Sequence, residues 1–444
     1  MSSLQTRLFL SREDLRDSYW FIPGLITLIF AIAAIITTQI DIGLNARIAA
    51  GVGDPSALDG SAWATLLSVI AGAIATIVGV VFSLILVVLT LASQQYGPLI
   101  VGNFIRDRGA HTVFGIYTGT FIFCVLVLVA FAVRTEVPFV PRLSAVGAIF
   151  LAVCCVLALI YFIHHIAVSI RPNSIIGNIT RSLLHNIQML RLEDDPNEPP
   201  APLSEMAVQS LDTLRAEGLP ILAQGTGYVI ACDKQRIFDL ARACDGAIEV
   251  STRPGQFVVK GSIIGRAYPA DRFDTSGLQS FHDAIALSPH RSPVQDIELF
   301  FSQLVVIASR ALSPAINDPF TAMTCIDHLG EALAKASLRS LPTPYRFDDE
   351  GNLRLISNVI TFDGLLHLSF NQVLLYGKGD LMVMLHLLNT IRQMGEVMHS
   401  IDEQRILQRY AGVVWGEAKH IHTSEYAQKA LADAYHRACA HMAD

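Results

Sequence analysis

The side chains best suited to chemistry in this sequence are uncharged and lie within or just after a long apolar segment. Ser83, Thr90, Gln94 and Gln95 belong to this set. Hydroxyl and amide groups of this kind can line a water-filled path, whereas a proton-coupled pump is expected to carry ionisable side chains inside its spans. The apolar segments of this chain contain no Asp, Glu, Lys or Arg. The sequence therefore favours a passive conduit over a pump.

The same segment carries small residues every four positions, namely Ala71, Ala75, Gly79 and Ser83. Small side chains at this spacing let helix backbones approach closely in lipid. Two interpretations stay open. In the first, the stripe packs against other helices of the bundle or of a homo-oligomer. In the second, copies of this helix surround a pore.

Two histidines, His164 and His165, end the fourth apolar segment. Histidine changes charge near neutral pH, so the pair could sense pH. The alternative is that the two rings only anchor the helix end at the membrane interface. Both interpretations stay open.

A third group of candidates lies in the segment 310–320, where Asp318 precedes a proline. An acid followed by proline is typical of a helix start, with the acid as N-cap. Ser313 and Asn317 can satisfy other free backbone groups nearby. These three residues therefore form either a tight helix–helix corner or a ligand site.

Motifs of known enzyme chemistry are absent from the sequence. It contains no P-loop, nucleophile elbow, HExxH motif or dinucleotide fingerprint. Its seven cysteines and fourteen histidines show no standard metal-ligand spacing. We therefore expect no catalytic site, no metal and no cofactor.

Four uncharged windows are long enough to cross a membrane as helices of about 20 residues. They span residues 18–40, 60–105, 109–133 and 143–170, with cores at 20–38, 63–93, 113–133 and 145–163. The second core would be about 46 Å long as a helix and exceeds the ~30 Å hydrocarbon layer. We therefore expect a four-helix transmembrane domain at 18–170, with one span too long to be only an anchor.

The arginines that flank these windows predict the orientation of the bundle. Arg7, Arg12 and Arg16 precede the first span, and Arg106 and Arg108 follow the second. The positive-inside rule then places both termini, including residues 1–17, in the cytoplasm. We expect a multi-pass protein of the bacterial inner (plasma) membrane.

The remainder of the chain reads as an α+β cytoplasmic domain. We expect an amphipathic connector and Pro-rich linker at 171–200, a small β-rich module at 201–270 and a mostly helical part at 271–444. Within the helical part, we expect helices near 278–287, 294–311 and 319–338. Residues 201–444 hold 27 acidic and 21 basic residues. That balance excludes the basic footprint of a nucleic-acid-binding protein.

Within the β-rich module, residues 254–264 follow the pattern PGxxVxxGxxI. The pattern resembles the turn–strand–turn of barrel-sandwich (lipoyl-like) modules, whose glycines take positive φ angles at the corners. Gly255 and Gly261 would be those corners. Lys260 lacks the context of a lipoyl-lysine, so no carried cofactor is expected.

Several short segments together resemble one known family. They are residues 92–96 (ASQQY), 103–107 (NFIRD), 227–229 (GYV), 253–258 (RPGQFV) and 310–320 (RALSPAINDPF). Over nearly its whole length the chain is similar to the bacterial predicted membrane-protein family called domain of unknown function 2254. The resemblance implies the membrane topology and an undefined activity, and it supplies no catalytic residues.

Two functions therefore remain as hypotheses. The first is a homo-oligomeric, channel-like conduit for ions or small solutes with a cytoplasmic regulatory domain. The second is a membrane-anchored scaffold or regulatory protein that binds a cytoplasmic protein partner without transport. In both, the lipid bilayer is a partner and nucleic acid is not.

Overall fold

The computed structural model describes residues 20–47, 61–97, 99–100, 107–133, 140–190, 212–339, 341–440 and 442. The chain divides into two compact units, Met1–Arg171 and Pro172–Asp444. We call them the membrane unit and the second unit. The predicted N-terminal segment 1–17 and Pro-rich stretch 194–203 lie outside the described residues.

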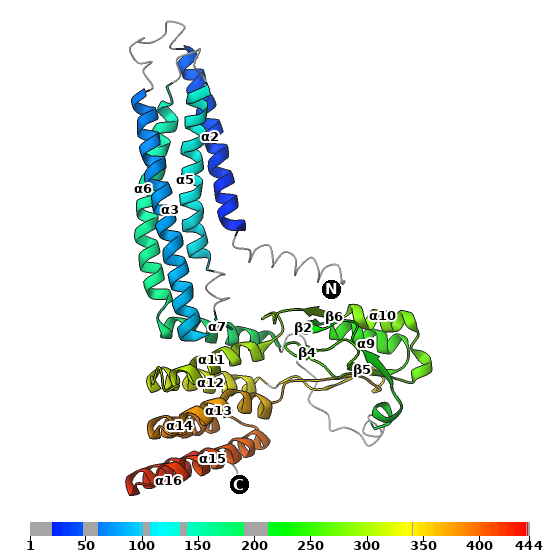
Figure 1. The fold of residues 1–444 in the computed structure, drawn as a ribbon. Helices are drawn as coiled ribbons and strands as arrows, with labels where there is room; N and C mark the ends of the chain where they lie inside the picture. The colour runs from blue at the N-terminus through cyan, green and yellow to red at the C-terminus, as the bar shows by residue number, and fades with distance from the viewer. Residues whose placement is uncertain are drawn as a thin grey trace. The chain divides into compact units, whose positions relative to one another are not determined.

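The membrane unit contains four long apolar helices, as the sequence predicts (Figure 1). They are α2 (Phe21–Arg47), α3 (Ser61–Tyr96), α5 (Arg108–Val133) and α6 (Arg142–Ser169). Each is long and apolar enough to cross a membrane. At 36 residues, α3 extends about 54 Å and is longer than its predicted core.

Helices α2 and α5 make the closest packing in the membrane unit, at two glycines. A Cβ atom at Gly115 would lie 2.8 Å from Ile26 Cδ1, and one at Gly119 would lie 2.8 Å from Phe30 Cδ2. Between them the hydroxyls of Thr27 and Thr118 share a hydrogen bond of 3.0 Å. Because glycine has no side chain, the two backbones can approach closely in lipid, which supplies no hydrophobic driving force for helix association.

A buried carboxylate joins the first span to the last. Asp41, on α2, is 1% exposed. Its oxygens accept hydrogen bonds from the backbone N–H groups of Leu143 and Ser144, both at 2.9 Å, and from the Ser144 hydroxyl at 2.7 Å. The first N–H groups of a helix have no partner within it and carry partial positive charge. Asp41 therefore caps the start of α6 from another helix.

The helical part of the second unit is a stack of three antiparallel helix hairpins (Figure 1). The hairpins are α11 (Ile297–Ala311) with α12 (Pro319–Leu338), α13 (Phe362–Gly377) with α14 (Leu381–Val397), and α15 (Ile401–Ile421) with α16 (Glu425–Cys439). Helix α11 packs on α13, α12 on α14, and α14 on α16. Such stacking, in which each hairpin covers the next, is typical of solenoid proteins.

Local sequence fixes where these helices begin. Every one of the six is preceded by a residue whose side-chain oxygen accepts a hydrogen bond from a backbone N–H of the first turn: Asp296, Asp318, Thr361, Asp380, Ser400 and Ser424. At the other end of the stack, α7 (Pro172–Leu190) covers the first hairpin. Its buried apolar residues recur at helical spacing, namely Ile175, Ile176, Ile179, Leu183 and Ile187.

The β-rich part consists of two small sheets. The first has five strands in the order β1 (Leu219–Leu222), β5 (Ile263–Tyr268), β3 (Ala247–Val250), β8 (Leu353–Ser357) and β7 (Tyr345–Phe347). The second has the order β4 (Phe257–Val258), β2 (Gly227–Cys232) and β6 (Ile285–Ser288). Helices α9 (Lys234–Ala243) and α10 (Thr275–Asp283) pack with these strands over a core that includes Phe281.

Two local expectations differ from this arrangement. The helix predicted at 278–287 is wrong in its last part, because α10 ends at Asp283 and residues from Ile285 form β6, which pairs with β2. The five-stranded sheet also crosses the predicted module boundary at residue 270, since β8 pairs in parallel with β3. As predicted, Gly255 and Gly261 take positive φ angles, of 91° and 88°.

A buried arginine holds the turn before β8. Arg354 donates to Asp348 Oδ2 at 2.6 Å and to Asp245 Oδ1 at 2.8 Å. Burial raises the pKa of the Asp348 carboxyl, but hydrogen bonds from Arg354 and Asn352 outweigh this effect and bring the pKa to about 2. The charged carboxylate therefore stabilises the folded chain above the ordinary Asp pKa of 3.8, and this contribution is lost as the pH falls towards 2.

We therefore expect Asp348→Asn to lower the thermal unfolding midpoint at pH 6 and to have little effect near pH 2. The measurement is the unfolding midpoint of the detergent-solubilised protein as a function of pH. Asp349→Asn, at the neighbouring exposed acid, is the control and should leave the curve unchanged. A difference between wild type and Asp348→Asn that stays constant with pH would contradict the assignment.

Candidate functional site

One side of α3 is left uncovered by the other described helices and carries small and hydroxyl residues. We call it the α3 face and define it by residues that recur at intervals of three or four: Thr65, Ser68, Gly72, Thr76, Gly79, Ser83, Leu86, Thr90 and Gln94. All of them are exposed. Intervals of three and four keep side chains on one side of a helix. Leu86 is the one large apolar residue in this line.

The three threonine hydroxyls and the Ser68 hydroxyl of the α3 face bond back to their own helix. Thr76 Oγ1 donates to the Gly72 carbonyl at 3.0 Å, and Thr90 Oγ1 donates to the Leu86 carbonyl at 2.8 Å. Thr65 and Ser68 make equivalent bonds four residues back. Because the hydrogens are used internally, these groups are stable in an apolar setting. Their oxygens still have lone pairs for water, a cation or another helix.

The predicted small-residue stripe divides between two surroundings. Ala71 is buried in a cluster with Leu67 and Phe123. Ala75, Gly79 and Ser83 are exposed, and a Cβ at Gly79 would meet no atom of the described chain within 4 Å. The predicted Thr90, Gln94 and Gln95 are exposed too. Beyond Ala71, therefore, the stripe does not pack on the chain's own described helices.

The face that α6 leaves exposed has a different character. Phe150, Leu157 and Ile160 are exposed there by 67%, 61% and 63%. Large apolar side chains of this kind suit contact with lipid tails. The α3 face is thus chemically distinct, although the exposed side chains of Val69, Val80, Phe82 and Val87 flank it.

The two predicted histidines have separate environments. His165 Nε2 lies 2.6 Å from Asp107 Oδ2, and its ring stacks on Tyr161 with centroids 5.4 Å apart. His164 is exposed. Asp107 also accepts the Gly109 backbone N–H at 2.9 Å. The pair therefore joins the start of α5 to the last turns of α6.

The predicted corner residues form a compact turn between α11 and α12. Asp318 accepts the Thr321 backbone N–H at 3.1 Å and the Thr321 hydroxyl at 2.6 Å. Ser313 donates to the Arg310 carbonyl at 2.6 Å, and Asn317 lies in the left-handed region with φ 51°. The hydroxyl of Ser313 and the carboxylate of Asp318 are thus used within the corner itself.

Sequence reasoning missed a cluster of charged groups around the start of α11. Arg253 donates to both carboxylate oxygens of Glu298, at 3.2 and 2.8 Å, and to Asn358 at 2.9 Å. Arg291 makes two bonds to Asp296, at 2.7 and 2.9 Å, and Asp296 is 1% exposed. In the sequence, Asp296 is an acid before an apolar helix and so indicates an N-cap. The sequence does not indicate which arginine pairs with this acid.

The four spans, the β-rich part, the first helix hairpin and most of the second lie within the match to a known family. The model of the family described as predicted membrane protein (DUF2254) matches residues 16–393. The chain belongs to this family. The resemblance expected from the sequence motifs is therefore confirmed. No solved structure matches this DUF2254 protein.

Among relatives of this DUF2254 protein are the uncharacterized protein Rv1290c of Mycobacterium tuberculosis and the uncharacterized protein Mb1321c of Mycobacterium bovis. Each is 29% identical over 335 residues, which cover 73% of this chain and 62% of the relative. The chain therefore spans less than two thirds of the length of these relatives.

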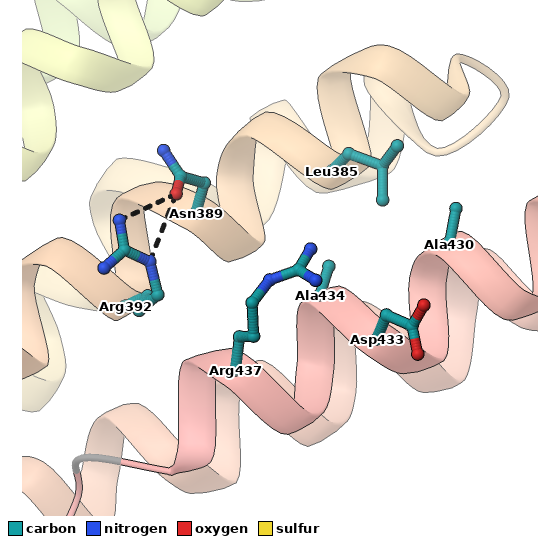
Figure 2. Close-up of a pocket in the computed structure, with 7 residues that line it drawn as sticks. All are labelled: Leu385, Asn389, Arg392, Ala430, Asp433, Ala434 and Arg437. Atoms are coloured by element: carbon teal, nitrogen blue, oxygen red, sulfur yellow. Dashed lines mark hydrogen bonds between the residues drawn. The ribbon is translucent and has the colours of Figure 1, made fainter.

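The DUF2254 protein also has a groove between α14 and α16, shown in Figure 2, with a volume of about 270 Å³. It is lined by Leu385, Asn389, Arg392, Ala430, Asp433, Ala434 and Arg437. The Arg392 guanidinium donates to Asn389 and pairs with Glu396. The groove is therefore lined by both basic side chains, Arg392 and Arg437, and an acidic one, Asp433. Among the residues that the structure describes, no cluster of His, Cys, Asp and Glu is arranged to hold a metal.

Proposed function

We propose that this DUF2254 protein is a homo-oligomeric, channel-like conduit for ions or small solutes in the bacterial inner membrane. The observation that carries the proposal is the uncovered α3 face, with its glycines and back-bonded hydroxyls. In the assembly, α3 helices from several copies surround a common path and the α3 face borders it. Oxygen atoms along such a path can replace part of a solute's hydration without a fixed charge, and the glycines leave room for the solute.

The second unit would regulate this path from the cytoplasm. The Tyr96 hydroxyl, at the end of α3, donates to the Ile170 carbonyl at 2.9 Å. Pro172 begins α7 two residues later. Rearrangement of α7 would thus move the Ile170 carbonyl that holds the end of α3. Nearby, the His165–Asp107 pair joins the end of α6 to the start of α5.

Conductance of the purified protein in planar bilayers tests the proposal. We expect unitary currents from wild type and their loss in Gly79→Leu, because a leucine would fill the path at this level. Since a Cβ at Gly79 has no close neighbour in the described chain, the unfolding midpoint should not change. Ala73→Leu is the matched control, which introduces the same leucine at an exposed α3 position off the face, and should conduct.

Absence of wild-type current at every voltage, pH and membrane tension would overturn the conduit. Equal currents from wild type and Gly79→Leu would show that the α3 face does not border the path. Electron microscopy of the detergent-solubilised particle gives a second test, in which a monomer contradicts the assembly.

A scaffold function is the second candidate, because the hairpin turns expose apolar side chains. Phe320, Met382 and Tyr426 are exposed by 76%, 62% and 77%, and they belong to three successive hairpins. A photo-crosslinking amino acid at position 426 should then capture one defined cytoplasmic protein, and Phe320→Ser should abolish the crosslink. Capture of no protein other than the chain itself would contradict a scaffold.

A further inference from the structure

Two loops of the β-rich part are held together as one surface, which we call the β-tip and define as residues 222–228 and 256–263. The Gly261 N–H donates to the Ala223 carbonyl at 2.8 Å, and the Ala223 N–H donates to the Ser262 carbonyl at 2.8 Å. The Lys260 N–H donates to Thr226 Oγ1 at 2.9 Å. These hydrogen bonds hold the two loops against each other, so the β-tip forms one continuous surface.

The β-tip turns apolar side chains outward. Leu222, Phe257, Val259 and Ile263 are exposed by 48%, 55%, 56% and 45%. Their neighbours Val258 and Ile264 are buried in the core. Alternation along a strand puts polar residues on the outer face when that face meets water. Here both faces are apolar, and Phe257 is held in place by an edge contact with Tyr228, with centroids 5.0 Å apart.

The charge of the β-tip differs from that of the rest of the second unit. Residues 219–232 and 254–265 contain one charged residue, Lys260, and no acid. The chain from residue 201 onward is acidic, with 27 acidic and 21 basic residues. Exposed apolar side chains beside a lysine, with no carboxylate in these two segments, suit the headgroup region of an anionic bilayer. There the lysine reaches the phosphates and the apolar groups reach the acyl boundary.

The size of the surface argues against a protein partner. Stable protein interfaces bury about 800 Å² on each partner and involve some 20–30 residues a side. Four half-exposed side chains fall well short of that area. Contact with a lipid surface requires no minimum buried area. Because the spans already hold the chain in the bilayer, the effective concentration of lipid near the β-tip is high, and a weak contact can still form.

We propose that the β-tip inserts into the headgroup region of the anionic bilayer in which the chain is anchored. Phe257 and Val259 enter deepest, Leu222 and Ile263 lie beside them, and Lys260 binds lipid phosphate. The contact is a second, reversible attachment of the second unit. It rests on membrane anchoring and is independent of the proposed conduit.

Quenching of tryptophan by brominated lipid tests the proposal in the full-length protein reconstituted in nanodiscs. Phe257→Trp places the probe in the β-tip and keeps an aromatic ring against Tyr228. Tyr426→Trp is the matched control at a 77% exposed aromatic of the hairpin stack. Emission of the three native tryptophans is subtracted using wild type. We expect strong quenching and a blue shift for position 257, and neither for position 426.

The role of charge is tested by exchanging anionic for zwitterionic lipid and by adding Lys260→Glu to Phe257→Trp. Either change should reduce the quenching. An unquenched, water-exposed tryptophan at 257 overturns the proposal. An unquenched but shielded one shows that protein covers the β-tip, and this also overturns it. If the quenching is the same with anionic and zwitterionic lipid and is unchanged by Lys260→Glu, the assignment to anionic headgroups is overturned.

Discussion

Leucine at Gly119 should destabilise the membrane unit strongly. A Cβ there would lie 2.8 Å from Phe30 Cδ2 and 3.0 Å from Phe30 Cγ, so α2 and α5 would have to separate along their contact. Overpacking of a tight interface costs about 1–3 kcal/mol and sometimes more. We expect the unfolding midpoint in detergent to fall by several degrees and much of the protein to aggregate. Thermal unfolding and size-exclusion chromatography measure both effects.

A series of variants separates this effect from a general intolerance of larger residues. At Gly115 even alanine should destabilise, because its Cβ would lie 3.0 Å from the Pro23 Cα, a backbone atom. Leucine at Gly72, where a Cβ meets no atom of the described chain within 4 Å, should leave the midpoint unchanged. A Gly119→Leu protein as stable as Gly72→Leu would mean that α2 and α5 do not pack at these glycines.

Removal of the Asp296 carboxylate should strongly destabilise the second unit. Asp296 caps α11 through the Leu299 N–H at 3.1 Å and holds Arg291 with two bonds. Gly255 lies directly over it, since a Cβ there would be 2.6 Å from Oδ2. Breaking a buried pair by removing one partner costs about 3–5 kcal/mol. Because Arg291 is 25% exposed, we expect Asp296→Ala to cost about 3 kcal/mol.

The control for this prediction is Asp380→Ala. Asp380 caps α14 through two backbone N–H groups and makes no ion pair among the described residues. Loss of a cap alone costs about 1 kcal/mol. Chemical denaturation of the detergent-solubilised protein compares the two variants. Equal losses of unfolding free energy would show that the Arg291 pair contributes nothing beyond the cap.

Local rules predicted much of this fold. The four spans follow from length and apolarity, and the start of α12 follows from Asp318 and Pro319, which place it at the observed residue. The Gly115–Gly119 spacing is also visible in the sequence, but the partner helix is not. Nothing local indicates that Ile248 on β3 pairs with Leu355 on β8, because parallel pairing between distant segments depends on the packing of everything between them.

The candidate site was predictable in composition but not in geometry. Counting every fourth residue selects Ala71, which the structure buries, and passes over Gly72 and Thr76, which lie on the exposed α3 face. Amphipathicity is weak in a helix that is apolar all round, so the sequence alone does not show which side the neighbours cover. The side is decided by where α5 and α6 lie against α3.

The cap that Asp41 provides for α6 has a consequence for biogenesis. Asp41 and Ser144 are 103 residues apart, a separation that a ribosome adding 5–20 residues per second covers in roughly 5–20 s. During that interval the first span carries a carboxylate without any of its three donors. Insertion of the fourth span supplies them all at once. Capping of the first span therefore waits for synthesis of the fourth span, and a chain truncated in the third span keeps an uncapped acid.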